Sequence, residues 1–371
     1  MPGRSHRRAT AMAWISLALV LAACGSGTKA PATSIPSTSP NTEPVATSAT
    51  STSAGSTSTE PASTVAAGPT SPLTGLPMLD ATTALRPALV VKIDNHPLAR
   101  PQSGLNEADI VFEENVEQLT RFAAVFQSGN SNPVGPIRSG RTQDIALLGS
   151  FNRPLFAWSG GNQRVTDAIR GSDLRQLSAL QQQHGFVRMG DRPAPHNLYS
   201  STDALFALAP ADAQAPLPQF SYRATAAEAV GDDIAAVNIS MDGVKVSWRW
   251  DPSIRAFLRF SDGKAHLDAI GKAQVSTDNV VVLFVAYAPS PADAHSPEAQ
   301  TLGSGDALVF SAGKLVKGTW TRTNRLQPFT LTDVGGAVIA LTPGRTFVEL
   351  ARAGSAAPVP AGVDPSSVAF P

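Results

Sequence analysis

The sequence of 371 residues contains one cysteine, Cys24, and this scarcity excludes two kinds of architecture. A single cysteine cannot close a disulfide within the chain, and it cannot supply a cysteine-rich metal site. The six histidines show neither an HExxH motif nor a paired spacing, so we expect no bound metal. Phosphate-binding loops of the GxxxxGK[ST] type and GxSxG serine motifs do not occur, and we expect no cofactor.

The sequence also lacks an excess of charge of either sign. The 29 basic residues balance the 29 acidic residues, and no block of like charges occurs. A protein that binds nucleic acid through counterion release requires a basic face. Nucleic acid is therefore not an expected partner.

The N-terminus has the pattern of a lipoprotein signal peptide, which we assign to residues 1–23. Three arginines in the first eight residues precede an apolar segment, 11–21, that is too short to span a bilayer. The segment ends in Leu-Ala-Ala-Cys-Gly, where small residues precede a cysteine that becomes lipidated. We expect acyl groups such as palmitate on Cys24 and anchoring at the extracytoplasmic face of the cell membrane. The alternative is that Cys24 is a buried core residue.

The next segment, 24–72, is composed almost entirely of Ser, Thr, Pro, Ala and Gly. Such a composition cannot bury enough apolar surface to fold, so we expect a disordered tether. Its Ser/Thr/Pro content also makes it a candidate for O-glycosylation.

The remaining residues predict an α+β (mixed α/β) protein in two domains. Apolar runs and turn signals divide the first domain, 73–215, into strands and short helices. A Pro/Ala-rich linker follows, and the second domain, 220–352, is predicted to be β-rich because strand signals recur there between Asp-Gly and Ala-Gly turns. Residues 353–371 are expected to form a flexible tail.

In the first domain, we predict strands at 88–94 and 154–160, a hairpin of 110–117 with 121–127, and helices at 102–109, 140–150 and 162–170. In the second, we predict strands at 235–240, 244–251, 256–260, 280–288, 307–310, 315–319 and 337–341.

Four stretches resemble one family, the YerB-like bacterial lipoproteins, a two-domain family of unknown function. The resemblance implies an envelope lipoprotein with an α/β-type first domain and a β-rich second domain, and it brings no established activity or ligand. The stretches are KIDNHPLARPQSGLNEADIVFEENVEQLTRF (92–122), VGPIRSGRTQD (134–144), RPAPHNLY (192–199) and GSGDALVFSAGKLVKGTWTR (303–322).

Two arginines three positions apart, Arg138 and Arg141, flank the start of the predicted helix at 140–150. With Ser139 as the N-cap, the helix would begin near Gly140 and present free N–H groups beside both guanidinium groups. This arrangement favours a carboxylate or phosphate ligand. The alternative is that each arginine pairs with an internal carboxylate: Glu113, Glu117 or Asp144.

The predicted strand at 110–117 places Glu113, Asn115 and Glu117 on one face, which we interpret as facing solvent or a cleft. If 118–120 is the turn, Glu117 lies opposite Arg121 and an ion pair between them is an alternative role for both.

A proline-rich loop, 192–197, carries Arg192, His196 and Asn197. His196 could act as a general base or bind a ligand. The alternative is that the histidine and the asparagine hydrogen-bond the backbone and fix the shape of the loop.

We therefore predict a cleft in the first domain that binds a cell-wall glycan or peptide fragment, or a wall-associated protein, without catalysis or with weak catalysis. A cell-wall hydrolase that uses Glu113 with Asp94, and a scaffold whose arginines form internal ion pairs only, are the alternatives. Catalytic candidates are Glu113, Asp94 and His196. The predicted cleft residues are Lys92, Asp94, Asn95, Glu113, Asn115, Glu117, Arg138, Arg141, Arg192, His196 and Asn197.

We expect Cys24→Ala to release the protein from the membrane, because Cys24 is the only predicted attachment point. Cell fractionation with a salt wash measures this. A variant that still sediments with membranes would contradict the assignment.

Overall fold

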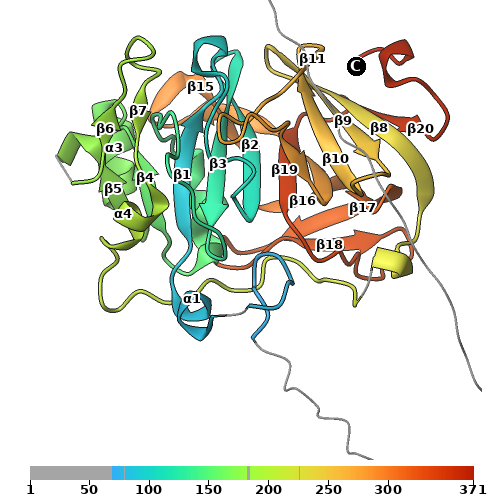
Figure 1. Ribbon diagram of the computed structural model, residues 1–371, viewed down its shortest axis with the longest axis horizontal. Helices are drawn as coiled ribbons and strands as arrows, with labels where there is room; N and C mark the ends of the chain where they lie inside the picture. Colours follow the sequence, from blue (N-terminus) through green and yellow to red (C-terminus); the bar gives the residue numbers. More distant parts are fainter. Residues whose placement is uncertain (1–68, 79, 182–183, 225) are drawn as a thin grey trace, which may run out of the picture. The chain divides into compact units, whose positions relative to one another are not determined.

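The computed structural model describes residues 69–371 except 79, 182–183 and 225. The predicted signal peptide, Cys24 and most of the predicted tether lie outside these residues. Within the described part, strands of both halves join one sheet of 16 strands, and helices are few and short (Figure 1). The predicted mixed α/β class with a β-rich C-terminal region is confirmed.

The first half contributes five strands to the sheet and four α-helices. The strands are β1 (Leu89–Asp94), β2 (Ile110–Val116), β3 (Leu119–Phe126), β4 (Leu155–Trp158) and β5 (Arg175–Ser178). The helices are α1 (Ala81–Leu85), α2 (Gln143–Leu147), α3 (Gln163–Arg170) and α4 (Thr202–Phe206), and the short strands β6 (Val187–Arg188) and β7 (Leu198–Tyr199) form a separate ribbon.

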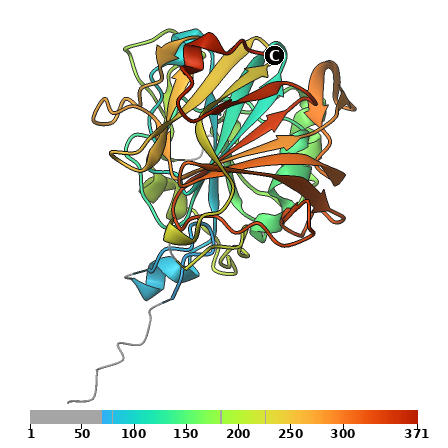
Figure 2. The same ribbon diagram turned by 90° about the vertical axis from the view of Figure 1, so that its right-hand side faces the viewer.

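The second half contains strands only, apart from single 3-10 turns. Its strands are β8 (Asp232–Met241), β9 (Val244–Asp251), β10 (Ala256–Ser261), β11 (Lys264–Ala265), β12 (Ser276–Thr277), β13 (Asn279–Phe284), β14 (Tyr287–Ser290), β15 (Asp293–Ala299), β16 (Gly303–Ser311), β17 (Lys314–Arg322), β18 (Thr330–Asp333), β19 (Thr346–Ala351) and β20 (Ala356–Pro360). Figure 1 shows most of these strands on the side of the molecule opposite to β4 and β5, and Figure 2 shows that side facing the viewer.

The two halves meet where β19 pairs in parallel with β2, and the sheet runs in the order β13-β19-β2-β3-β1-β4-β5. Four of these pairings are parallel, and the two pairings of β3 are antiparallel. Strands β13, β19, β2, β1, β4 and β5 therefore run in the same direction, and β3 alone among them is reversed. The carboxyl ends of six strands from both halves therefore lie along one edge of the sheet, which we call the carboxyl edge.

Several predicted elements differ from the structure. Residues 102–109 form turns rather than a helix, and 337–341 forms isolated bridges rather than a strand. The predicted helix at 140–150 begins only at Gln143, as α2, and continues as a 3-10 turn. The expected flexible tail, 353–371, includes β20, which pairs with β8.

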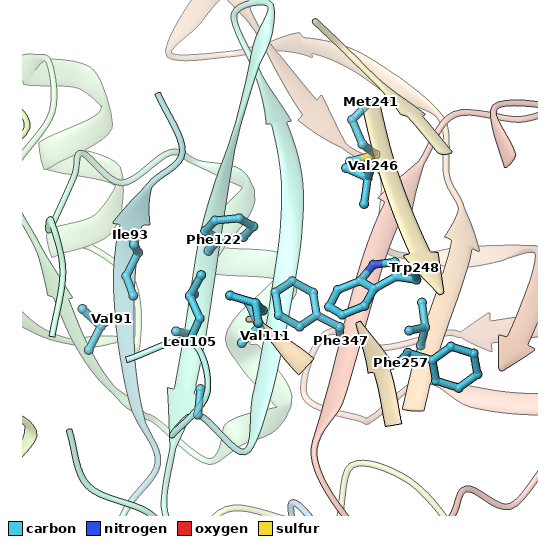
Figure 3. Close-up of a cluster of buried hydrophobic side chains, with 14 of the residues drawn as sticks. Val91, Ile93, Leu105, Val111, Phe122, Met241, Val246, Trp248, Phe257 and Phe347 are labelled. Atoms are coloured by element: carbon cyan, nitrogen blue, oxygen red, sulfur yellow. The ribbon is translucent and has the colours of Figure 1, made fainter. Parts of the chain in front are cut away.

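Apolar side chains on the two faces of the sheet form two core clusters. Alternation along β2 puts Val111 in one cluster and Phe112 in the other, as expected for a strand that is covered on both sides. Figure 3 shows Phe122, Phe347 and Trp248 in succession across the junction between the halves. The ring of Phe347 lies 5.9 Å from that of Phe122 and 4.7 Å from that of Trp248, measured between centroids.

The polar face of β2 does not face a cleft, contrary to the prediction. Every residue of β2 is buried, because β19 pairs along one side of it and strands of the second half cover the face that was expected to be open. Glu113 and Asn115 both have no exposed surface. Asn115 accepts a hydrogen bond from the backbone N–H of Asp242, in the β8–β9 turn, at 2.9 Å.

Glu113 belongs to a buried polar network at the junction of the halves. One carboxylate oxygen accepts hydrogen bonds from Thr120 at 2.6 Å and Asn95 at 3.1 Å, and the other pairs with Arg259 of β10 at 2.5 Å. Neither Glu113 nor the Arg259 side chain is exposed to solvent. The nearby carboxyl of Glu349, in β19, accepts a hydrogen bond from the indole of Trp248 at 2.7 Å.

Removing Arg259 should destabilise the protein strongly. Arg259→Met leaves the buried carboxylate of Glu113 without its cation, which is expected to lower the free energy of unfolding by about 3 to 5 kcal/mol. Arg255→Met, at an exposed arginine in the β9–β10 turn, is the control and should change it by less than about 0.5 kcal/mol. Urea unfolding measures both; equal stability of the two variants would contradict the role of the network.

The same network makes stability depend on pH. Burial raises the pKa of Glu349 well above the ordinary 4.5, and the negative charge of Glu113 raises it further. The folded protein then holds a proton that the unfolded chain has lost, so the free energy of unfolding falls as pH rises above about 4.5.

Glu349→Gln should therefore reduce the loss of stability between pH 5 and pH 7, because the amide keeps the shape of the carboxyl and cannot ionise. Urea unfolding at the two pH values measures this, with Asp306→Asn, an exposed carboxylate on β16, as the control. A decline as steep as that of the unaltered protein would show that Glu349 is not protonated in the fold.

Candidate functional site at the carboxyl edge

Three parallel strands of the first half end side by side at the carboxyl edge. Asp94 is the last residue of β1, Gly160 and Gly161 follow β4, and Leu180 follows β5. Parallel strands direct their carboxyl ends toward a common crevice, which is where ligands bind in open α/β sheets. The order and direction of the strands in the first half thus create a crevice, whichever side chains line it.

A cavity of about 430 Å³ lies at this position, and we call it the arginine cleft. It is open to solvent and has three arginines in its walls. Its lining comprises Arg138, Ser139, Arg141, Ser159, Gly160, Gly161, Asn162, Val165, Leu180, Arg188, Pro195 and Asp293.

Arg138 lies beside the carboxylate of Asp94, with its Nε 3.1 Å from Oδ2. The same oxygen lies 2.7 Å from Nδ1 of His196, and the ring of His196 stacks on that of His96 at 4.5 Å between centroids. Asp94 therefore contacts two other predicted site residues, Arg138 and His196. The contact with Asp94 fixes the orientation of His196.

Arg141 lies in a loop and not in a helix, contrary to the prediction. Thr142 precedes α2 with no side-chain cap, and α2 has only one turn, so Ser139 caps nothing. The guanidinium of Arg141 donates to Glu117 at 2.6 Å and to Ser296 of β15 at 3.0 Å. The ion pair with Glu117 is thus present, while Arg141 also lines the arginine cleft.

Arg121 was not predicted as a site residue, yet it adds positive charge beneath the cleft. Arg121 is 7% exposed, and its guanidinium donates to the carbonyl of Ser139, a cleft residue, at 2.8 Å. Burial, together with repulsion from Arg141 and Arg138, lowers the pKa of Arg121 to about 9. It lies opposite Asp94 and Glu114 in the sheet, not opposite Glu117, because the turn is 117–118.

The backbone after β4 supplies hydrogen-bond donors to the cleft. Gly160 has φ of 113°, a conformation that side chains rarely adopt, and Asn162 caps α3 by accepting from the N–H of Val165 at 2.9 Å. The first N–H groups of α3 point out of the helix toward its N-terminal end. The sequence Gly-Gly-Asn before a helical pattern is a signal for a helix N-terminus with exposed N–H groups.

The other predicted site residues have structural partners. Arg192 donates to the carbonyls of Ala99 and Pro101, and Asn197 accepts from Arg188 at 2.8 Å while donating to the carbonyl of Met189. These contacts fix the loop at 192–197, as the alternative interpretation expected.

Lys92 and Asn95 are also buried away from the cleft. The ammonium of Lys92 contacts Glu114 and lies 2.8 Å from Asp144, and burial lowers its pKa to about 8. Asn95 bridges Glu113 and Thr120, with its Nδ2 at 3.1 and 2.7 Å. The residues of the predicted single cleft thus fall into two groups. Arg138 and Arg141 line the open cleft, and Arg138 contacts Asp94, which in turn contacts His196. The other group is the buried network around Glu113.

Among the described residues, no group of three or more His, Cys, Asp or Glu side chains is arranged to hold a metal ion. No helix within the same residues is long and apolar enough to cross a membrane.

The geometry of the arginine cleft suits an anion. Guanidinium groups donate to carboxylates and phosphates in pairs, and a helix N-terminus adds N–H donors and a favourable dipole. Asp94 and Glu117 each neutralise one arginine, whereas Arg121 and Arg188 have no ion pair within the described part of the chain.

Comparisons with known proteins agree with this organisation. Residues 73–215 match the N-terminal domain, and residues 235–348 the C-terminal domain, of a family described as protein of unknown function (DUF3048). The chain is 29% identical over 295 residues to the putative lipoprotein YerB of Bacillus subtilis (strain 168), covering 76% of this chain and 85% of that protein.

The crystal structure of the YerB protein from Bacillus subtilis matches with a TM-score of 0.68 at 25% identity, over 76% of this chain and 96% of that one. The resemblance read from the sequence is thereby confirmed. This chain belongs to the DUF3048 family of proteins of unknown function and is a relative of the putative lipoprotein YerB.

Proposed function

We propose that this protein is a lipid-anchored envelope protein that binds a carboxylate- or phosphate-bearing component of the cell wall in the arginine cleft. The observation that carries the proposal is the convergence of Arg138, Arg141 and Arg188 on the N-terminal end of α3, above the buried Arg121. The relative's name as a putative lipoprotein supports the anchoring.

The position of the cleft in the fold also supports binding to a wall component. The described chain begins near α1, and both views place α1 at the end of the molecule opposite to β15 and the C-terminus (Figures 1 and 2). The cleft lies at the β15 end, since Asp293 and Ser296 of β15 contact or line it. A ligand can therefore approach the cleft from the side opposite to α1.

Binding is proposed in preference to hydrolysis. Glu113, the carboxylate that a hydrolase was expected to use, has no exposed surface and is paired with Arg259. An acid or base must reach the proton that it transfers, and a buried carboxylate paired with a buried arginine does not.

The double variant Arg141→Gln/Arg188→Gln should weaken binding of phosphate and of soluble wall fragments at least tenfold. Two charge-assisted hydrogen-bond donors are lost, each contributing about 1.5 to 3 kcal/mol. The melting temperature without ligand should change by only a few degrees, because Glu117, the partner of Arg141, is 40% exposed and is solvated when unpaired.

Isothermal titration calorimetry of the full-length protein in detergent measures the affinity. Arg170→Gln, at the exposed carboxyl end of the same helix α3, is the matched control for loss of an arginine. Unchanged affinity in the double variant, or an equal loss in the control, would contradict the proposed function.

A further inference from the structure

A second cavity, of about 550 Å³, lies at the carboxyl edge beside the arginine cleft, and we call it the proline cavity. It is lined where strands of both halves end: Glu117 follows β2, Arg352 follows β19, and Tyr287 comes shortly after β13. The rest of its lining is Gln118, Asp242, Ala288, Pro289, Ala294, His295, Ser296 and Pro297.

The two cavities share one wall. Arg141 lines the arginine cleft, and its guanidinium donates to Glu117 and Ser296, which both line the proline cavity. Strand β15 also runs from one to the other, with Asp293 in the first and Ala294 in the second. The cavities are therefore neighbouring compartments of one groove along the carboxyl edge.

The strand order gives the length of this groove. Four steps separate β4, which ends at the arginine cleft, from β19, which ends at the proline cavity. At a strand spacing of about 4.8 Å, the groove spans about 19 Å. An extended peptide advances about 3.3 Å per residue, so about six residues reach from one compartment to the other.

The lining of the proline cavity suits a peptide backbone. The pairing of β14 with β15 shifts register after Pro289, which leaves Ala294, His295 and Ser296 outside the paired positions. The N–H of His295 donates to the side chain of Asp293 at 3.2 Å, and the other unpaired backbone groups of this stretch can bind an extended chain by strand addition. Pro289 and Pro297 line the cavity with apolar rings, which lack hydrogen-bond donors and can pack against ligand side chains.

Carboxylates on the rim of the proline cavity can accept amide N–H groups. Asp242 is held by Arg352 through two contacts, of 2.8 and 2.6 Å, and Arg352 packs on the ring of Tyr287 at 4.6 Å. Glu117 is held by Arg141 through one contact, of 2.6 Å. The acidic groups are thus fixed in position in the cavity wall, and each carboxylate has acceptor sites beyond those that its arginine occupies.

We propose that the ligand is an extended peptide whose free carboxylate binds in the arginine cleft and whose preceding residues cross the Arg141–Glu117 ion pair into the proline cavity. This inference rests on the proposed function, because it identifies the anion that binds in the arginine cleft as the C-terminal carboxylate of a peptide. A peptide segment of the cell wall has the required chemistry.

The test uses peptides of alternating glycine and serine with two, four, six and eight residues, each with a free or an amidated C-terminus. Full-length protein in detergent is titrated with each peptide by isothermal titration calorimetry. Affinity should increase from two to six residues and then level off, and amidation should weaken binding at least tenfold. Chito-oligosaccharides of matched length provide the glycan arm.

Ala294→Trp should fill the proline cavity, since Ala294 is exposed and lines it. The six-residue peptide should then bind no more tightly than the two-residue peptide, whose affinity should be unchanged. Ala337→Trp, at an exposed alanine that lines neither cavity, is the matched control and should alter neither affinity.

The outcomes separate this inference from the proposed function. Binding of the two-residue peptide with no gain from length, or no effect of Ala294→Trp, would overturn the groove while leaving the anion site intact. No binding of phosphate or of any free-carboxylate peptide would overturn both. Length-dependent binding of the oligosaccharides in place of the peptides would overturn the peptide assignment.

Discussion

The ion pair between Glu113 and Arg259 is the constraint on which the rest of the structure depends. It joins β2 of the first half to β10 of the second in a place where neither charge reaches solvent. The hydrogen bonds of Asn95 and Thr120 to the same carboxylate extend this connection to β1 and β3. Charges in such a position must be paired, so the two halves cannot separate without a large loss of stability.

This rigid junction positions the carboxyl edge. Because β2 and β19 are held in register, the residues that follow them, Glu117 and Arg352, lie at fixed positions relative to Asp94 at the end of β1. The arginine cleft and the proline cavity form there from loops that are supported by strands. A scaffold of this kind holds its charged groups in position before a ligand arrives, so little ordering is required on binding.

The sequence was sufficient to predict the local elements with strong patterns. The apolar run of β1, the hairpin of β2 and β3, and the helix after Asn162 all lie where periodicity and capping indicated. The sequence was insufficient where long-range pairing decided the outcome. Nothing near Glu113 indicates that β19, more than 200 residues later, pairs beside it, or that Arg259 of β10 reaches it and makes a polar strand face a buried one.

The site was predicted in part for the same reason. Asp94, Arg138 and His196 lie together, as expected from their shared chemistry, but the helix expected to place Arg141 is absent. Arg121 was considered only as a partner of Glu117, because the turn was expected at 118–120; with the turn at 117–118, Arg121 lies opposite Glu114 instead. The glycines after β4 are a local signal for a helix N-terminus. Because that helix starts at the carboxyl end of a parallel strand, its N-terminus lies where ligands bind in such sheets.

The central claim is that an anion binds where the arginines meet the N-terminal end of α3. Its most direct measurement is a phosphate titration of the full-length protein labelled with ¹⁵N-glycine, followed by NMR. The account predicts saturable shifts of the amide signals of Gly160 and Gly161, with no shift for Gly263 in the distant β10–β11 turn. Unperturbed signals from Gly160 and Gly161 at saturating phosphate would contradict it.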